Sequence, residues 1–103
     1  MALRTDRLPE ARLDLIEIWH YIAADNPKAA DRVLDSINTS IGRLAVYPEL
    51  GRASPEIQKN LRSMVSGHYF VFYTPRREAI EVVRVIRAER DVSPEMLEGA
   101  GDK

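Results

Sequence analysis

The chain changes its hydrophobic periodicity once, at Tyr47-Pro48-Glu49-Leu50-Gly51-Arg52. Before this segment, apolar residues recur at three- and four-residue steps, which is the spacing of one helix face. After it, short runs rich in β-branched and aromatic residues are separated by turn residues, which is typical of strands. Helices in one half and strands in the other indicate an α+β fold. The segment therefore predicts the turn between a helix hairpin and a small sheet.

The first half predicts two helices. Pro9 suits an early helical position, where its missing N–H is not needed, and Glu10 complements the helix dipole. Asp25-Asn26-Pro27 breaks the pattern, with Asn26 as N-cap of the second helix and Pro27 as its first residue. Pro48 ends that helix. The short connection predicts that the two helices form an antiparallel hairpin.

The first helix has a wide apolar face. Its apolar positions are Leu8, Ala11, Leu15, Ile18, Trp19 and Ile22, and Leu13 and Ile16 widen the face further. A face this wide predicts a helix that is covered on more than one side. Trp19 and Tyr21 are expected in core or helix-edge packing.

The second half predicts strands over residues 61–66, 69–74 and 79–87, after a weak first strand at residues 3–5. The connections Gly67-His68 and 75–78 are short enough for hairpins, so the last three strands are expected to form an antiparallel meander. The dense apolar character of 79–87 indicates a central strand covered on both faces. Ser93-Pro94-Glu95 predicts the cap of a short C-terminal helix.

Composition sets the frame for this fold. A chain of 103 residues predicts one domain spanning 1–103. It has no cysteine, so disulfides, thiolate metal sites and thiol nucleophiles are excluded. The N-terminus lacks the apolar stretch of a signal peptide, and no apolar run approaches the roughly 20 residues of a membrane span. We therefore expect a cytoplasmic protein with no membrane contact.

Charge is distributed unevenly. Residues 1–50 hold six Lys or Arg against eight Asp or Glu, whereas residues 51–90 hold eight against four. The basic second half fits an anionic target or an acidic protein partner. It equally fits a solvated surface without any such target.

No motif for cofactor or metal binding is present. The chain has no Gly-rich phosphate loop and no HExxH, and His20 and His68 are expected on a helix surface and in a hairpin turn. We predict no cofactor, no metal site and no catalytic residue, with His68 as a possible contact beside the basic sheet.

In order and spacing, these elements resemble the ParE/RelE superfamily of toxins from bacterial toxin–antitoxin pairs. The resemblance runs from Leu3 to Asp91. It rests on the first helix at 11–22, the Pro48-Glu49-Leu50-Gly51-Arg52 loop, Leu61-Arg62, the strand at 69–73 and the ending at 82–91. It implies an N-terminal strand, an antiparallel helix hairpin packed on a small, mostly antiparallel sheet, and a short C-terminal helix.

The resemblance implies one of two activities. RelE-like members are ribosome-dependent mRNA endonucleases, which need groups that activate the 2′-hydroxyl, protonate the leaving oxygen and stabilise the phosphorane. Such members usually carry a lysine-rich set with a Tyr or His near the C-terminal end, and here no Tyr or His follows Tyr73. ParE-like members inhibit DNA gyrase by binding it. The loop and the strand ending are closer to ParE, although Arg87 stands where many members have histidine. A degenerate toxin that only binds antitoxin is the third interpretation.

The arginines are candidates for binding the target. This predicted set consists of Arg52, Arg62, His68, Arg87 and Arg90. Guanidinium groups engage phosphate or carboxylate in a forked geometry. The alternative is that they serve structural ion pairs, Arg62 with a helix carboxylate and Arg90 with Asp91 or a loop carboxylate.

The resemblance also implies an antitoxin partner. Antitoxins of this class wrap a C-terminal segment around the toxin and place apolar anchors in grooves beside the helix hairpin. Leu13, Ile16 and Tyr21 are candidate groove residues. The alternative is that these three side chains complete the core.

Overall fold

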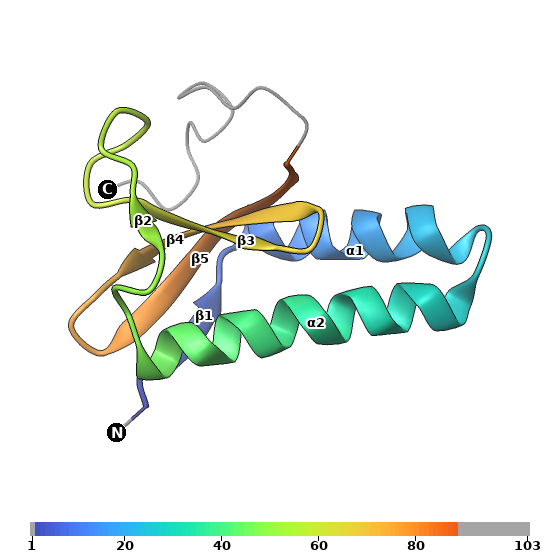
Figure 1. Ribbon diagram of the computed structural model, residues 1–103, viewed down its shortest axis with the longest axis horizontal. Coiled ribbons are helices and arrows are strands. Elements are labelled where there is room, and N and C mark those ends of the chain that lie inside the picture. Colours follow the sequence, from blue (N-terminus) through green and yellow to red (C-terminus); the bar gives the residue numbers. More distant parts are fainter. Residues whose placement is uncertain (1, 89–103) are drawn as a thin grey trace.

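A computed structural model describes residues 2–88 of the chain. Its elements are, in order, β1 (Arg4–Arg7), α1 (Pro9–Ala23), α2 (Pro27–Val46), β2 (Arg52–Ala53), β3 (Arg62–Ser66), β4 (Tyr69–Pro75) and β5 (Ala79–Arg87). Figure 1 shows α1 and α2 side by side as an antiparallel hairpin that packs on the sheet. The predicted α+β fold is confirmed. The predicted helix near residue 93 lies outside the described residues.

The five strands form one sheet in the order β1-β5-β4-β3-β2. β1 runs parallel to β5, and all other neighbours are antiparallel. The predicted meander of β3, β4 and β5 is therefore confirmed. β2 was not predicted, because two residues are too short to carry an alternating pattern.

β5 lies inside the sheet between β1 and β4, as expected of a strand covered on both faces, and its two faces belong to two apolar clusters. Ile80, Val82 and Val85 pack in the cluster that includes helix residues. Val83 and Ile86 pack in a second cluster on the other face. The switch in parity after Val82 comes from a β-bulge, because Tyr73 of β4 lies opposite Val82 while its neighbour Phe72 lies opposite Arg84.

The helices begin where the sequence predicts. Pro9 and Pro27 are the first residues of α1 and α2. The Asn26 side chain accepts a hydrogen bond of 3.1 Å from the Ala29 amide, as expected of an N-cap.

The prediction that α1 is covered on more than one side is wrong. Only Ala11 and Leu15 of this helix are fully buried, whereas α2 buries Ile37, Ile41 and Leu44 among others. The side chains of Leu13 and Ile16 point away from the core and are more than half exposed. Helix α1 therefore has more apolar side chains than are buried in this core.

Candidate functional site

The loop between α2 and β2 is fixed to the sheet by the phenol of Tyr73. This hydroxyl donates to the Pro48 carbonyl at 2.8 Å and accepts from the Gly51 amide at 2.9 Å. Tyr73 is fully buried. Burial raises the pKa of its hydroxyl above the usual 10.0, while the Gly51 hydrogen bond opposes the rise. The phenol thus remains neutral and can both donate and accept.

The close approach of Tyr73 explains the glycine at position 51. A Cβ on Gly51 would lie 2.7 Å from the Ser63 carbonyl oxygen and 2.7 Å from the Tyr73 ring. These distances are far below an ordinary contact, so a larger residue would displace the loop. The Gly51 of the sequence motif is therefore a structural requirement of this loop.

Arg62 fixes the same loop from the neighbouring strand. Its Nη1 atom donates to the carbonyl oxygens of Glu49 and Gly51. The ion pairs found among residues 2–88 do not include Arg62, so its expected pairing with a helix carboxylate is wrong. Arg62 combines a structural role with a position at the wall of a cavity.

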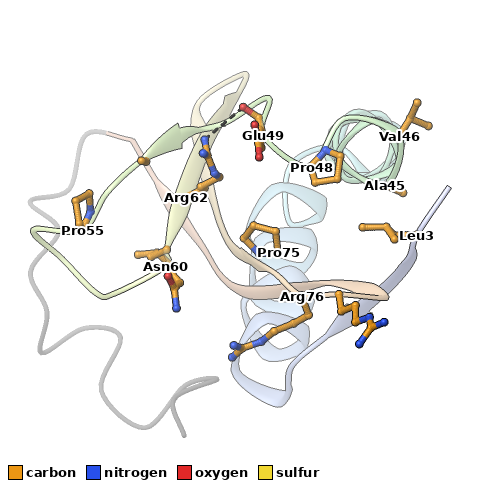
Figure 2. A pocket seen from close by; sticks show the side chains of 13 residues that line it. Leu3, Ala45, Val46, Pro48, Glu49, Pro55, Asn60, Arg62, Pro75 and Arg76 are labelled. Atoms are coloured by element: carbon orange, nitrogen blue, oxygen red, sulfur yellow. Dashed lines mark hydrogen bonds between the residues drawn. The ribbon is translucent and has the colours of Figure 1, made fainter. Parts of the chain in front are cut away.

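That cavity has a volume of about 700 Å³ and lies between the end of α2, the start of β3 and the β4–β5 turn (Figure 2). Its charged lining residues are Glu49, Arg62, Arg76 and Arg77. Arg76 is paired with Glu81 at 3.0 Å. The remainder of the lining is mostly apolar, so the cavity combines basic and apolar side chains.

Arg52 and Arg62 are not brought together by the sheet. On the paired strands β2 and β3, Arg52 lies opposite Ser63, whereas Arg62 lies opposite Ala53. Because directly opposite residues share a face of the sheet, the two arginines lie on different faces. Arg52 is exposed.

His68 and Arg87 lie at the other end of β3. The amide of Ala88 donates to the His68 carbonyl at 2.8 Å, and the Arg87 guanidinium carbon lies 5.9 Å from the centroid of the Tyr69 ring. His68 and Tyr69 line a second hollow of about 390 Å³ against α2. The five residues of β3 separate this end from Arg62 by about 15 Å. Arg90 lies outside the described residues.

The sequence did not indicate the role of Arg84. The Asp14 carboxylate of α1 accepts from Arg84 Nε at 2.7 Å, from Arg84 Nη2 at 2.9 Å and from the Val85 amide at 2.9 Å. The hydrogen bond to Asp14 raises the pKa of Arg84. β1 pairs with β5 only as far as Val82. Beyond this point the Asp14 carboxylate, instead of a neighbouring strand, accepts the hydrogen bond of the Val85 amide. No pattern in sequence reveals a contact between residues 70 positions apart.

The three candidates for antitoxin binding are on the surface. The exposed fractions are 58% for Leu13, 53% for Ile16 and 75% for Tyr21. The alternative that they complete the core is therefore wrong. Trp19, by contrast, is half-buried, and its Nε1 donates to Asp31 of α2 at 2.8 Å.

Two further findings concern residues 2–88. Within this range, no group of three or more His, Cys, Asp or Glu side chains is placed to hold a metal ion. Neither of its helices combines the length and the apolar character needed to cross a membrane.

Comparison with known families gives a match over most of the chain. The sequence model described as "ParE toxin of type II toxin-antitoxin system" matches residues 7–92. The chain belongs to this ParE toxin family. Its members form the toxin half of a toxin–antitoxin system, so the resemblance stated from the sequence is confirmed.

Several curated proteins are similar to this ParE-family chain. Toxin ParE1 of Mycobacterium tuberculosis is 34% identical over 86 residues, which cover 82% of this chain and 88% of that protein. A putative toxin, Y4kP of Sinorhizobium fredii, is 38% identical over 81 residues, covering 77% and 79%. Toxin RelE3 of Caulobacter vibrioides is 30% identical over 78 residues, covering 75% and 85%.

A solved structure described as "Chromosomal ParDE TA system from P. aeruginosa" has the same fold. Its TM-score is 0.70, its sequence identity is 18%, and the match covers 84% of this chain and 96% of that chain. At this identity the likeness concerns the arrangement of helices and strands.

Proposed function

We propose that this ParE-family toxin acts in the bacterial cytoplasm by binding and inhibiting DNA gyrase, and that a small antitoxin neutralises it. Membership of the ParE family supports the toxin role. The resemblance of the Pro48–Arg52 loop and the last strand to ParE-like toxins supports gyrase as the target. Binding, rather than bond cleavage, is the proposed mode of action.

The observation that carries this proposal is the separation of the candidate residues. Arg62 is engaged by carbonyls of its own loop, while His68 and Arg87 lie about 15 Å away at the far end of β3. General acid–base catalysis on RNA needs these groups within hydrogen-bond reach of one phosphodiester. Separate basic and apolar surfaces are better suited to a protein interface.

The exposed face of α1 supports an antitoxin partner. Leu13 and Ile16 of α1 are more than half exposed, whereas Ala11 and Leu15 are the residues of this helix that are buried in the core. Exposed apolar side chains grouped in this way are typical of binding surfaces. We propose this face as the antitoxin site.

The test is gyrase supercoiling of relaxed plasmid with and without the purified toxin. We expect supercoiling to fall or cleaved DNA to accumulate, and activity to return when the cognate antitoxin is added first. Gyrase with antitoxin alone is the control. Full supercoiling in the presence of folded toxin would reject gyrase as the direct target.

One grouping favours a second candidate, ribosome-dependent mRNA cleavage. His68 and Tyr69 line the hollow beside α2, and the Arg87 guanidinium carbon lies 5.9 Å from the centroid of the Tyr69 ring. One relative carries the name Toxin RelE3. Primer extension on mRNA translated in a purified system tests this activity. Cut mRNA together with unaffected gyrase would favour the second candidate, and no effect in either assay would favour a toxin reduced to antitoxin binding.

A further inference from the structure

Three exposed apolar side chains gather where α2 ends. Val46 is 52% exposed, Tyr47 63% and Leu50 44%. They line one shallow hollow together with Pro48 and Glu49. We name Val46, Tyr47 and Leu50 the apolar loop surface. Contiguous exposed apolar residues on a soluble domain mark a site of interaction.

The apolar loop surface is held rigidly. The Leu50 amide donates to the Tyr47 carbonyl at 3.0 Å, which closes a tight turn. Pro48 and Gly51 on either side of Leu50 are fixed by the Tyr73 hydroxyl. A surface that is ordered before binding loses little conformational entropy when a partner docks.

The basic cavity continues from this surface. Val46, Pro48 and Glu49 line both the hollow and the cavity of about 700 Å³. Figure 2 shows Arg62 and Arg76 on other walls of the cavity, on β3 and at the β4–β5 turn. Together with Arg77, the lining contains three arginines and one glutamate. An occupant of this cavity therefore meets a positive rim beside an apolar wall.

We propose that the apolar loop surface and the adjoining cavity bind a segment of another protein that carries apolar anchor side chains next to Asp or Glu. The anchors would pack on Tyr47 and Leu50. The carboxylates would accept hydrogen bonds from Arg77, which is exposed. The apolar lining and the Glu49 carboxylate make the site less suited to the phosphates of a nucleic acid.

This site is distinct from the exposed face of α1. Tyr21 lies near the connection between the helices, close to the start of α2, whereas Tyr47 follows the last residue of α2. The 20 residues of α2 span about 30 Å. A partner segment bound at the apolar loop surface therefore leaves Tyr21 accessible unless it is long enough to reach both ends of the hairpin.

A displayed library of random peptides provides the test. The library is selected on the wild-type protein and counter-selected on the Tyr47→Ser/Leu50→Ser variant, whose changed side chains are exposed. We expect the enriched peptides to combine Asp or Glu with large apolar residues. A synthetic copy of an enriched peptide, labelled with fluorescein, then gives dissociation constants by anisotropy.

We expect the dissociation constant of this peptide to rise by about tenfold or more for the Tyr47→Ser/Leu50→Ser variant. Val65→Ser, which changes an apolar residue 59% exposed on β3, is the matched control and should leave binding unchanged. Arg77→Glu should weaken binding by about fivefold, and Arg12→Glu, on the exposed side of α1, should not. Circular dichroism verifies that every variant is folded.

Three results would overturn the proposal. The selection could yield no peptide that distinguishes the wild type from the Tyr47→Ser/Leu50→Ser variant. The enriched peptides could lack acidic residues or bind Arg77→Glu as tightly as the wild type. Finally, a labelled single-stranded RNA could bind at the same residues and displace the peptide, which would assign the site to nucleic acid.

Discussion

The hydroxyl oxygen of Tyr73 lies 2.9 Å from the amide nitrogen of Gly51 and 2.8 Å from the carbonyl oxygen of Pro48. One buried phenol thus satisfies a donor and an acceptor of a loop that lies more than twenty positions earlier in the chain. A polar group that is buried without a partner is costly. The position of this loop on the sheet therefore depends on the phenol and on the absence of a side chain at Gly51.

Substitution of Gly51 should destabilise the fold. The Cβ of Gly51→Ala would meet the Ser63 carbonyl oxygen at 2.7 Å, and backbone cannot move aside as a flexible side chain can. We expect the free energy of unfolding, measured in urea, to fall by about 1–3 kcal/mol. The matched control is Gly42→Ala in α2, where a Cβ meets nothing within 4 Å. This change should stabilise the helix by about 0.5–1 kcal/mol. Equal effects of the two changes would contradict the clash.

Removal of the Tyr73 hydroxyl should loosen the loop with little change in the core. Tyr73→Phe keeps the ring but leaves the Gly51 amide and the Pro48 carbonyl without this partner. We expect the free energy of unfolding at pH 7 to fall by about 1–3 kcal/mol. Hydrogen exchange should accelerate at Gly51 more than in the centre of β5. Unchanged exchange at Gly51 would show that the hydroxyl does not hold the loop.

The same residue makes stability depend on alkaline pH. Because burial raises the pKa of Tyr73 above 10.0, the folded state holds this proton more tightly than the unfolded state does. The resulting stability is fully present below pH 10 and is lost as the pH rises through the raised pKa. Urea unfolding across this range should show a steeper loss for the wild type than for Tyr73→Phe. Parallel profiles would contradict the raised pKa.

The sequence predicted most of the fold because the helices and strands are set by local patterns. Pro9, Asn26 and Pro27 act within a few residues, so the helix starts could be read from the chain. The aromatic and β-branched run of 69–74 and the apolar run of 79–87 identified the meander in the same way. β2 was missed because its two residues acquire strand geometry only by pairing with β3.

The candidate site was harder to predict because its contacts are distant in sequence. The partners of Arg62 are loop carbonyls, which carry no residue-type signal. The exposure of Leu13 and Ile16 could not be predicted either. A wide apolar face fits both a helix that is buried on two sides and a helix that retains a binding surface.

The pair formed by Asp14 and Arg84 should contribute more than the other ion pairs. Asp14→Ala removes a carboxylate that is 11% exposed and accepts from Arg84 and from the Val85 amide. We expect a loss of about 2–3 kcal/mol in the free energy of unfolding. The control Asp6→Ala removes the ion pair between Arg4 and Asp6, whose side chains are 65% and 39% exposed. That loss should be much smaller than the loss in Asp14→Ala, because exposed ion pairs contribute little to stability. Similar losses in both variants would contradict a structural role for Asp14.

Toxicity should depend on Arg87, the last residue of β5, and on Arg90, which follows it three positions later in the sequence. We expect Arg87→Ala/Arg90→Ala to weaken target binding by about tenfold and to relieve growth arrest on induced expression. Because Arg87 contacts the Tyr69 ring, circular dichroism should verify that the variant is folded. Arg12→Ala/Arg43→Ala, which removes two exposed helix arginines, is the control. Undiminished arrest in the first variant would reject Arg87 and Arg90 as target residues.

Antitoxin binding should depend on the exposed face of α1. Because Leu13 and Ile16 are 58% and 53% exposed, Leu13→Asp/Ile16→Asp should fold with nearly the wild-type stability. The two carboxylates would have to be buried against apolar anchors of the antitoxin, so we expect binding to weaken about a hundredfold or more in titration calorimetry. Val65→Asp, on β3, is the matched control. Full affinity of the folded Leu13→Asp/Ile16→Asp variant for its cognate antitoxin would place the antitoxin site elsewhere.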